Sequence, residues 1–479
     1  MVYGMPSFSD DEFCVLRQRS RGQYRAGGQA VFTLTRPPIL MAKFDDKKSK
    51  LDPAAVIRRI EDAKLIKPDG KVTYQGWFFE DLISMLETSL SFSTPFPDPV
   101  KRRLIWDTLM SPAAAKPLTK SSFTRELNIR EAEYINRSPA QYVLATSISL
   151  LSTLKVAPIR ISGGGRIIFL PKLPGRFDRS SLADRFTENL HNPNPKGYIV
   201  ATVKVGARSP LEAFDNAMDE LDYVRGIWNF VASRNTREIF LNGLTRPINP
   251  FCLGQVHTLH EATGKLVAES YWYNQYFVHH DPMGSVSKWG TVKASEKKIR
   301  HAVKPSRYPS DLRTIFVKYA RALDGVDYEV VFTKLWSLLE FLTHCEDGKY
   351  DLLIRRCKFL FKEPEFQGQI LEHLRQRRNS FVHAATETVL AKSLVFQLKH
   401  YVDQMIMFHL KNSLRFRNRE DAAGFLDLPY DPEVIRQRIR RLKMGHRFRS
   451  PGAQRHSGRS SVSPTKADNR KAEENDGNH

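Results

Sequence analysis

Apolar residues recur along much of this chain at the spacing of helices that bury one face. From about residue 53 to 155 they predict a mostly helical region, in which Val56 and Ile60 lie one helical turn apart. The apolar run 142–154 is assigned to the same helical region. Residues 1–52 mix Gly, Pro, Arg and Lys and are interpreted as an irregular N-terminal segment.

The period of the pattern changes in the middle of the chain, between residues 156 and 285. Two short apolar runs, 158–161 and 166–170, flank Ser162–Gly165 and predict a β-hairpin. The glycine-rich turn lacks the Lys-Ser/Thr pair of a phosphate-binding loop, so a turn is the preferred interpretation. Residues 197–205 predict a strand. The whole stretch is therefore expected to be an α+β region.

A helix is predicted to start directly after that strand. Ser209 is suited to cap it, Pro210 fits the first turn, and Glu212 is placed to reach back to the cap. Further strand-like runs follow at 238–241 and 266–277, which complete the α+β region.

The C-terminal part begins with a polar, basic stretch, 286–307, interpreted as a linker. Four amphipathic stripes between 308 and 412 then predict an up-and-down four-helix bundle. The stripe of the first helix is Leu312, Ile315, Phe316, Tyr319 and Leu323. Residues 413–451 are expected to form a helical or irregular extension, and 452–479 a disordered basic tail. The predicted fold class is thus α+β, multidomain and predominantly helical.

The net charge narrows the range of partners. The chain of 479 residues carries a formal charge of +22, which favours polyanions, with nucleic acid ahead of an anionic membrane. Residues 433–479 contribute 12 Lys and Arg against 5 Asp and Glu. The alternative interpretation is a solvated basic surface, because charge alone says nothing about chemistry.

The cysteines and the hydropathy indicate a cytoplasmic protein. The four cysteines form no C-x-x-C pair, so a thiolate zinc site is not expected, and such sparse usage suits a reducing compartment. No signal peptide is recognised, and no stretch approaches 18 uninterrupted apolar residues, so no membrane partner is expected.

The segment from Leu374 to His383 is the most informative in the chain because it contains Arg378, Asn379 and His383. The bare Arg-x4-His pattern is weak evidence: with 43 Arg and 14 His in 479 residues it is expected about once by chance. A second match, Arg441 with His446, lies next to the tail and is set aside. The first match follows an apolar helical stripe, and this context distinguishes it.

The residue types in this motif suit metal-free cleavage of RNA, whose 2′-hydroxyl is a built-in nucleophile. His383 is able to act as base or acid near neutral pH, Arg378 offers donors to phosphoryl oxygens, and Asn379 is suited to orient the imidazole. Arg375 and Arg377 are expected to contact RNA, and no metal or cofactor is needed. Alternatively, His383 caps the helix C-terminus and the arginines form a solvated basic face.

The span 308–412 resembles HEPN domains, and their Apea-like branch in particular. The resemblance rests on Phe332–Leu342 in the second helix and on Arg378–His383 after the third. It covers roughly a fifth of the chain. Proteins with this motif are typically metal-independent endoribonucleases that dimerise so that two motifs face one cleft, and many act in phage defence or as toxins.

The resemblance implies roles for individual residues. Arg378 and His383 would be catalytic and Asn379 supporting. Glu340 matches an acidic position in an earlier helix of such domains and would have a supporting role, although an exposed helix residue without function is the alternative. Some HEPN domains with intact motifs only bind, so the alternative function is a non-catalytic dimerisation or nucleic-acid-binding module.

Two further signals are weaker. A metal site at His279, His280 and Asp281 is not favoured. Adjacent histidines on a strand point to opposite sides, and no further ligand is placed by spacing to complete a site. The aromatic run 271–277 is suited to stack on single-stranded bases, but sheet core is the preferred interpretation. The expected partners are therefore RNA, a second copy of the chain through the bundle, and an unknown trigger bound by residues 53–285.

Overall fold

The fold is described from a computed structural model of the chain. The backbone is described for residues 3–4, 42–45, 51–76, 78–234, 247–279, 281–282, 286–345, 348–384 and 391–449, and side chains for these residues except 3–4, 286–288 and 380–384. The chain divides into two compact units, residues 1–423 and 424–479, and each is described by itself. Most of the predicted segment 1–52, the run 238–241 and the tail 452–479 lie outside the described residues.

The first part of unit 1 is helical, as the apolar stripes predict. Its helices are α2 (Pro53–Asp62), α3 (Phe79–Ser89), α4 (Asp98–Leu109) and α5 (Lys120–Ile135), with short paired strands β2 (Lys43–Phe44) and β5 (Leu90–Ser91), and β3 (Lys64–Ile66) and β4 (Val72–Tyr74). Ile57, Ile83, Leu86 and Leu127 belong to one apolar core. The buried carboxylate of Glu131 on α5 accepts hydrogen bonds from the amides of Ala42 and Ser93, both at 3.1 Å. It thereby connects α5 to the segments beside β2 and β5.

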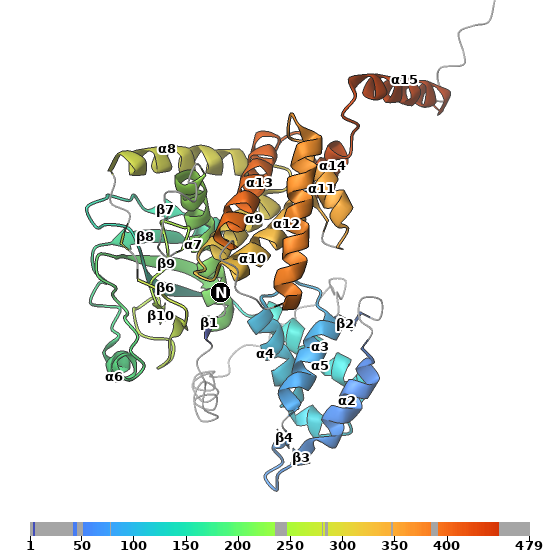
Figure 1. The fold of residues 1–479 in the computed structure, drawn as a ribbon. Helices are drawn as coiled ribbons and strands as arrows, with labels where there is room; N and C mark the ends of the chain where they lie inside the picture. The colour runs from blue at the N-terminus through green and yellow to red at the C-terminus, as the bar shows by residue number, and fades with distance from the viewer. Residues whose placement is uncertain are drawn as a thin grey trace, which may run out of the picture. The chain divides into compact units, whose positions relative to one another are not determined.

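The described residues of unit 1 include a seven-stranded antiparallel sheet, on the left in Figure 1. Its order is β1 (Tyr3–Gly4), β11 (Trp272–Asn274), β10 (Val256–Glu261), β6 (Ala140–Ile148), β9 (Ile199–Ala207), β8 (Arg166–Leu170) and β7 (Ile159–Arg160). The paired β7 and β8 confirm the predicted hairpin, and β9 confirms the predicted strand at 197–205. Within the predicted run 266–277, the strand is limited to Trp272–Asn274.

The helical interpretation of 142–154 is wrong. Ala140–Ile148 is strand β6, which pairs with β9 on one side and β10 on the other. A short, continuous apolar run fits a buried helix and a central strand equally well, and it is the two neighbouring strands that decide. The helical region therefore ends at Ile135 instead of 155.

Helix α7 (Pro210–Ser233) packs across β6 and β9. It starts as its sequence predicts: the Ser209 hydroxyl accepts from the amide of Glu212 at 3.2 Å, and a carboxylate oxygen of Glu212 accepts from the amide of Arg208 at 2.6 Å. The first bond satisfies an amide that the first turn of a helix leaves without a partner, and the second ties the helix to the residue before the cap. The cap thus fixes where the chain turns from β9 onto the sheet.

The predicted linker 286–307 is also wrong, because most of it is helix α8 (Val286–Val303). Its few apolar residues include Trp289 and Val292, which are buried. The Trp289 ring meets those of Trp228 on α7 and Phe251, with centroids 5.1 and 5.8 Å apart. Trp289, Val292 and Val303 are three buried apolar residues on a mostly polar helix of 18 residues, which is too weak a periodic pattern to recognise from the sequence.

Between residues 309 and 411 the chain forms a helical assembly, as predicted, but the described residues contain five helices instead of four. They are α9 (Pro309–Leu323), α10 (Tyr328–Thr343), α11 (Tyr350–Lys358), α12 (Pro364–Ala384) and α13 (Ala391–Lys411). Leu335 and Leu339 on α10 and Leu398 and Val402 on α13 are fully buried where these helices pack. Pro364 separates α11 from α12, because proline is tolerated in the first turn of a helix and not in its interior.

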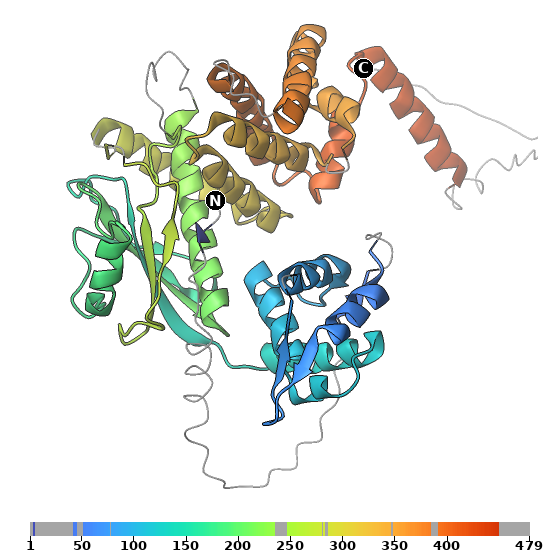
Figure 2. The same ribbon diagram turned by 60° about the horizontal axis from the view of Figure 1, so that its bottom comes forward.

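These helices share a core with the α+β region. Helices α7 and α9 pack side by side, as both ribbon views show (Figure 2). Arg225 on α7 is fully buried and bonds both Asp222 and Asp324, at 2.6 and 2.7 Å. Burial alone would raise the pKa of Asp222, but the guanidiniums of Arg225 and Arg321 hold it below its usual value. The buried ion pairs thus join segments about a hundred residues apart.

The described chain ends in α14 (Arg419–Leu426) and α15 (Pro432–Arg449), within the predicted extension 413–451. No residue of α15 is buried. Within the described residues, none of the helices combines the length and apolar character needed to cross a bilayer.

Candidate functional site

The Arg-Asn-x-x-x-His motif lies in the last two turns of α12. The helix is held by Leu371 and Leu374, whose side chains are fully buried, and it ends at Ala384. Arg378 and Asn379 therefore stand on a fixed helix beyond its buried anchors. The rotation of 100° per residue places positions 378 and 383 about 140° apart around the axis.

Arg378 is half-buried and is aimed at the start of α11. Its guanidinium carbon lies 5.3 Å from the ring centroid of Tyr350, and its Nη1 donates to Oδ1 of Asn379 at 3.3 Å. None of the carboxylates in the described part of the chain forms an ion pair with it. An arginine that packs on an aromatic ring has no carboxylate to neutralise its positive charge. The charge is then available to bind an anion.

The backbone of His383 is helical, and its side chain lies outside the described residues. Position 383 follows Asn379 by four residues and Gln376 by seven, so the three positions share one face of α12. The side chains of Asn379 and Gln376 are exposed. Position 383 therefore lies on the same face of α12 as Gln376 and Asn379, whose side chains are exposed to solvent.

The two predicted RNA-contacting arginines differ in their surroundings. Arg375 bonds Asp351 at 2.9 Å and Glu372 at 2.6 Å. Because Asp351 is almost fully exposed, that pair contributes little to stability. Arg377 is half-buried and forms no ion pair with the carboxylates that the structure describes.

Glu340 is connected to the motif through two aromatic residues. The carboxylate accepts from Trp336 Nε1 at 3.0 Å, and the Trp336 ring meets the Tyr350 ring edge to face at 6.0 Å. Tyr350 in turn lies under Arg378. Tyr350 could not be recognised from the sequence, because an aromatic residue at the start of a helix gives no indication of the guanidinium that packs on its ring.

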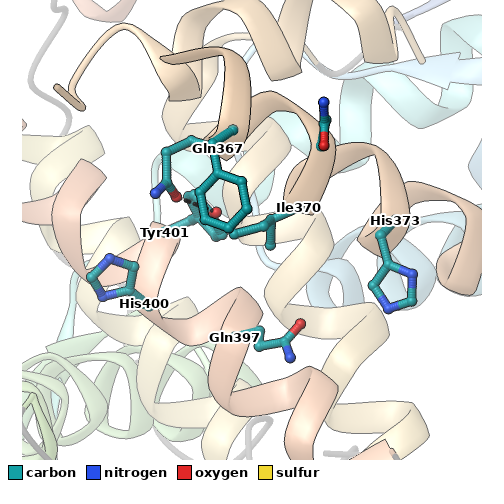
Figure 3. A pocket seen from close by; sticks show the side chains of 8 residues that line it. Gln367, Ile370, His373, Gln397, His400 and Tyr401 are labelled. Carbon is teal, nitrogen blue, oxygen red and sulfur yellow. Dashed lines mark hydrogen bonds between the residues drawn. The ribbon is translucent and has the colours of Figure 1, made fainter. Parts of the chain in front are cut away.

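A groove of about 620 Å³ lies between α12 and α13 (Figure 3). It is lined by Phe366, Gln367, Gln369, Ile370, His373, Gln397, His400 and Tyr401. The Tyr401 hydroxyl donates to Oε1 of Gln367 at 2.6 Å, which fixes that amide at the wall. The spacing of Phe366, Ile370, His373 and Arg377 puts Arg377 next along the same helix face, toward the motif.

The weaker signals resolve into structural roles where they are described. Tyr271 and Trp272 are buried, and Trp272 stacks on Phe214 at 4.1 Å, so they belong to the sheet core. Tyr276 is exposed. His279 stacks on Tyr198 at 5.4 Å, and His280 lies outside the described residues. In the described part of the chain, no three His, Cys, Asp or Glu side chains are grouped to hold a metal ion.

The second Arg-x4-His match, Arg441 with His446, lies on α15. All residues of α15 from Arg436 onward are exposed, so this copy has no apolar core to position its side chains. It provides a natural control for the copy on α12.

Comparison with models of known protein families, with curated proteins and with solved structures found no match for this chain.

Proposed function

We propose that the chain is a metal-independent endoribonuclease of the HEPN type, with its active site at the C-terminal end of α12. The observation that supports this most directly is Arg378: a half-buried guanidinium next to Asn379, resting on an aromatic ring, with no described carboxylate to neutralise it. The excess of basic residues, +22 over the chain, favours a polyanionic substrate.

The chemistry needs one proton acceptor and one fixed cation. His383 removes the proton of the ribose 2′-hydroxyl, and the 2′-oxygen forms a bond to phosphorus as the bond to the 5′-oxygen breaks. Arg378 binds the phosphoryl oxygens, whose charge grows in the transition state. The products are a 2′,3′-cyclic phosphate and a 5′-hydroxyl, which takes up a proton.

The neighbours of the motif have positioning roles in this proposal. Tyr350 and Asn379 fix the guanidinium of Arg378, and Glu340 holds Trp336 against Tyr350. The groove between α12 and α13 has an aromatic and amide lining suited to a nucleobase next to the cleaved bond. Arg377 follows this lining along the same face of α12, toward the motif.

The protein is proposed to act as a homodimer in the cytoplasm, where two copies of α12 would supply a base and an acid to one cleft. Phage defence or a toxin system is the proposed setting, and the part of the chain between 53 and 285 is proposed to bind the trigger. The buried ion pair between Arg225 and Asp324 supports the proposed trigger-binding role, because it connects the end of α9 rigidly to α7, which packs on the sheet.

The test is RNA cleavage by the purified full chain in EDTA. His383→Ala and Arg378→Ala are each expected to lower the cleavage rate by at least about a hundredfold, the usual contribution of a general base or an electrostatic donor. His446→Ala, in the second copy of the pattern, is the matched control and should cleave at the unaltered rate.

Two outcomes would overturn the proposal. Cleavage that survives His383→Ala would place the chemistry elsewhere. RNA that is bound and never cut by the unaltered chain, under any tested trigger, would leave a non-catalytic nucleic-acid-binding module.

A further inference from the structure

Helix α15 has an unusual distribution of charge. It carries seven Lys and Arg residues against the single acidic residue Glu433, and none of its residues is buried. Its cations include four at intervals of four, three and four residues, namely Arg436, Arg440, Lys443 and Arg447. This spacing gathers them within a sector of about 60° along a length of about 16 Å. We call these four residues the basic stripe.

The side chains of the basic stripe are exposed. Arg436 is paired with Glu433 at the first turn, an exposed ion pair of the kind that contributes little and exchanges readily. The other three stripe cations have no carboxylate partner among the described residues. A row of exposed cations on one helix face matches a row of phosphates, since each phosphate bound releases a condensed counterion.

The apolar residues of α15 distinguish between the polyanions it could meet. Ile435, Ile439 and Leu442 form a narrow stripe, but Met444 and Phe448 lie across the helix from it. A helix that lies in a membrane surface collects its apolar side chains on one face. The divided apolar residues of α15 do not fit that pattern, and its positive charge disfavours pairing with a second copy of itself.

We propose that α15 is an RNA-docking helix whose basic stripe lies along the phosphate backbone. Its preference for RNA over DNA rests on the proposed nuclease function; the phosphate contact itself does not. The helix would hold RNA while the motif on α12 cleaves it, so binding and cleavage are carried by different residues.

The test compares two triple variants of the full chain, each also carrying His383→Ala so that RNA stays intact. One removes stripe cations (Arg436→Gln, Arg440→Gln, Arg447→Gln), and the other removes cations outside the stripe (Arg438→Gln, Arg441→Gln, Arg449→Gln). Both change the same residue type in the same helix by the same charge. The probe is a fluorescent RNA hairpin, titrated over a range of salt concentrations.

The stripe variant is expected to bind at least about tenfold more weakly, with a salt slope reduced by about two to three units, whereas the other variant should change the slope by less than about one. A third variant, Ile439→Pro, breaks the helix without changing its charge and should also weaken binding. Unaltered thermal unfolding would show that the variants are folded.

Several results would overturn the inference: equal losses in the two triple variants, full binding by Ile439→Pro, tighter binding of vesicles with anionic lipids than of RNA, or equal affinity for a DNA hairpin of the same sequence. The two proposals fail separately, because cleavage is measured in the unaltered chain and in the stripe variant with His383 restored. Loss of stripe-dependent binding while these chains still cleave RNA contradicts only the docking role. Stripe-dependent binding with no cleavage by the unaltered chain contradicts only the nuclease.

Discussion

At the scale of single residues, the clearest energetic feature is the buried guanidinium of Arg225. It bonds Asp222 and Asp324, and its Nη1 also donates to the carbonyl of Phe251 at 2.9 Å. Taking three charged groups out of water is costly, so the arrangement is stable only while every partner is present. Arg321 bonds Asp222 from the surface and is half-exposed.

Replacing Arg225 with Met is therefore expected to lower the free energy of unfolding by about 3–5 kcal/mol, because Asp324 would be left buried without its cation. Arg321→Met, which removes a half-exposed partner of Asp222, should cost no more than about 1 kcal/mol. Urea unfolding of both variants measures the difference. Equal losses would mean that burial of the guanidinium is not what matters.

A second carboxylate of interest on α7, that of Asp215, is half-buried. Its Oδ2 is buried without a hydrogen-bond partner among the described residues, and burial together with the nearby Asp219 carboxylate raises the pKa of Asp215 to about 6. In the unfolded chain the pKa is about 3.8, so the folded state favours the protonated form. This preference stabilises the protein below pH 3.8 and is lost as the pH rises through 6.

Asp215→Asn keeps the side chain neutral at every pH. It is expected to raise the free energy of unfolding by about 1 kcal/mol at pH 8, and to change it little at pH 4. Unfolding curves at the two pH values measure this, with Asp281→Asn, a change at an exposed aspartate, as the control. A gain of equal size at both pH values would contradict the assignment.

At the scale of elements, the close crossing of α7 and α9 depends on a missing side chain. A Cβ at Gly226 would lie 2.1 Å from the carbonyl oxygen of Phe316, which belongs to the backbone of α9. Backbone cannot turn aside as a flexible side chain can, so any larger residue would force the two helices apart. Gly290 on α8, by contrast, has open space around the same position.

Gly226→Ala is thus expected to destabilise the protein by about 1–3 kcal/mol through overpacking. Gly290→Ala should stabilise it by up to about 1 kcal/mol, because alanine favours a helix more than glycine does. Thermal unfolding of the pair decides, since the same substitution should act with opposite sign. Two shifts of the same sign would rule out the close contact as the cause.

At the scale of the whole molecule, the buried core and the exposed basic helix α15 belong to different units. The buried residues that join the sheet to helices α9–α13 lie in unit 1, whereas α15 in the second unit buries nothing. The proposed site therefore lies on a helix fixed by a large core, whereas α15, the most basic of the described helices, contributes no core residue.

Removing residues 432–479 should therefore leave the melting temperature within about 2 °C of the full chain, while RNA affinity falls as it does in the stripe variant. Calorimetry and the hairpin titration measure the two effects. A large drop in melting temperature would show that this segment packs onto the rest of the protein.

The sequence by itself determined the features whose cause is local. The apolar stripe of α9 and the Ser209 cap of α7 were both predicted, because helix periodicity and capping depend only on neighbouring residues. The position of Arg378 near the end of a helix followed for the same reason.

Only the tertiary structure decided the rest. Residues 140–148 became a strand because β9 and β10 lie on either side, and 286–303 became a helix because Trp289 found a buried site against α7. Tyr350 reaches Arg378, and Asp324 reaches Arg225, across intervals that no local pattern records. Contacts between distant segments depend on how elements pack, and packing is a property of the folded chain as a whole.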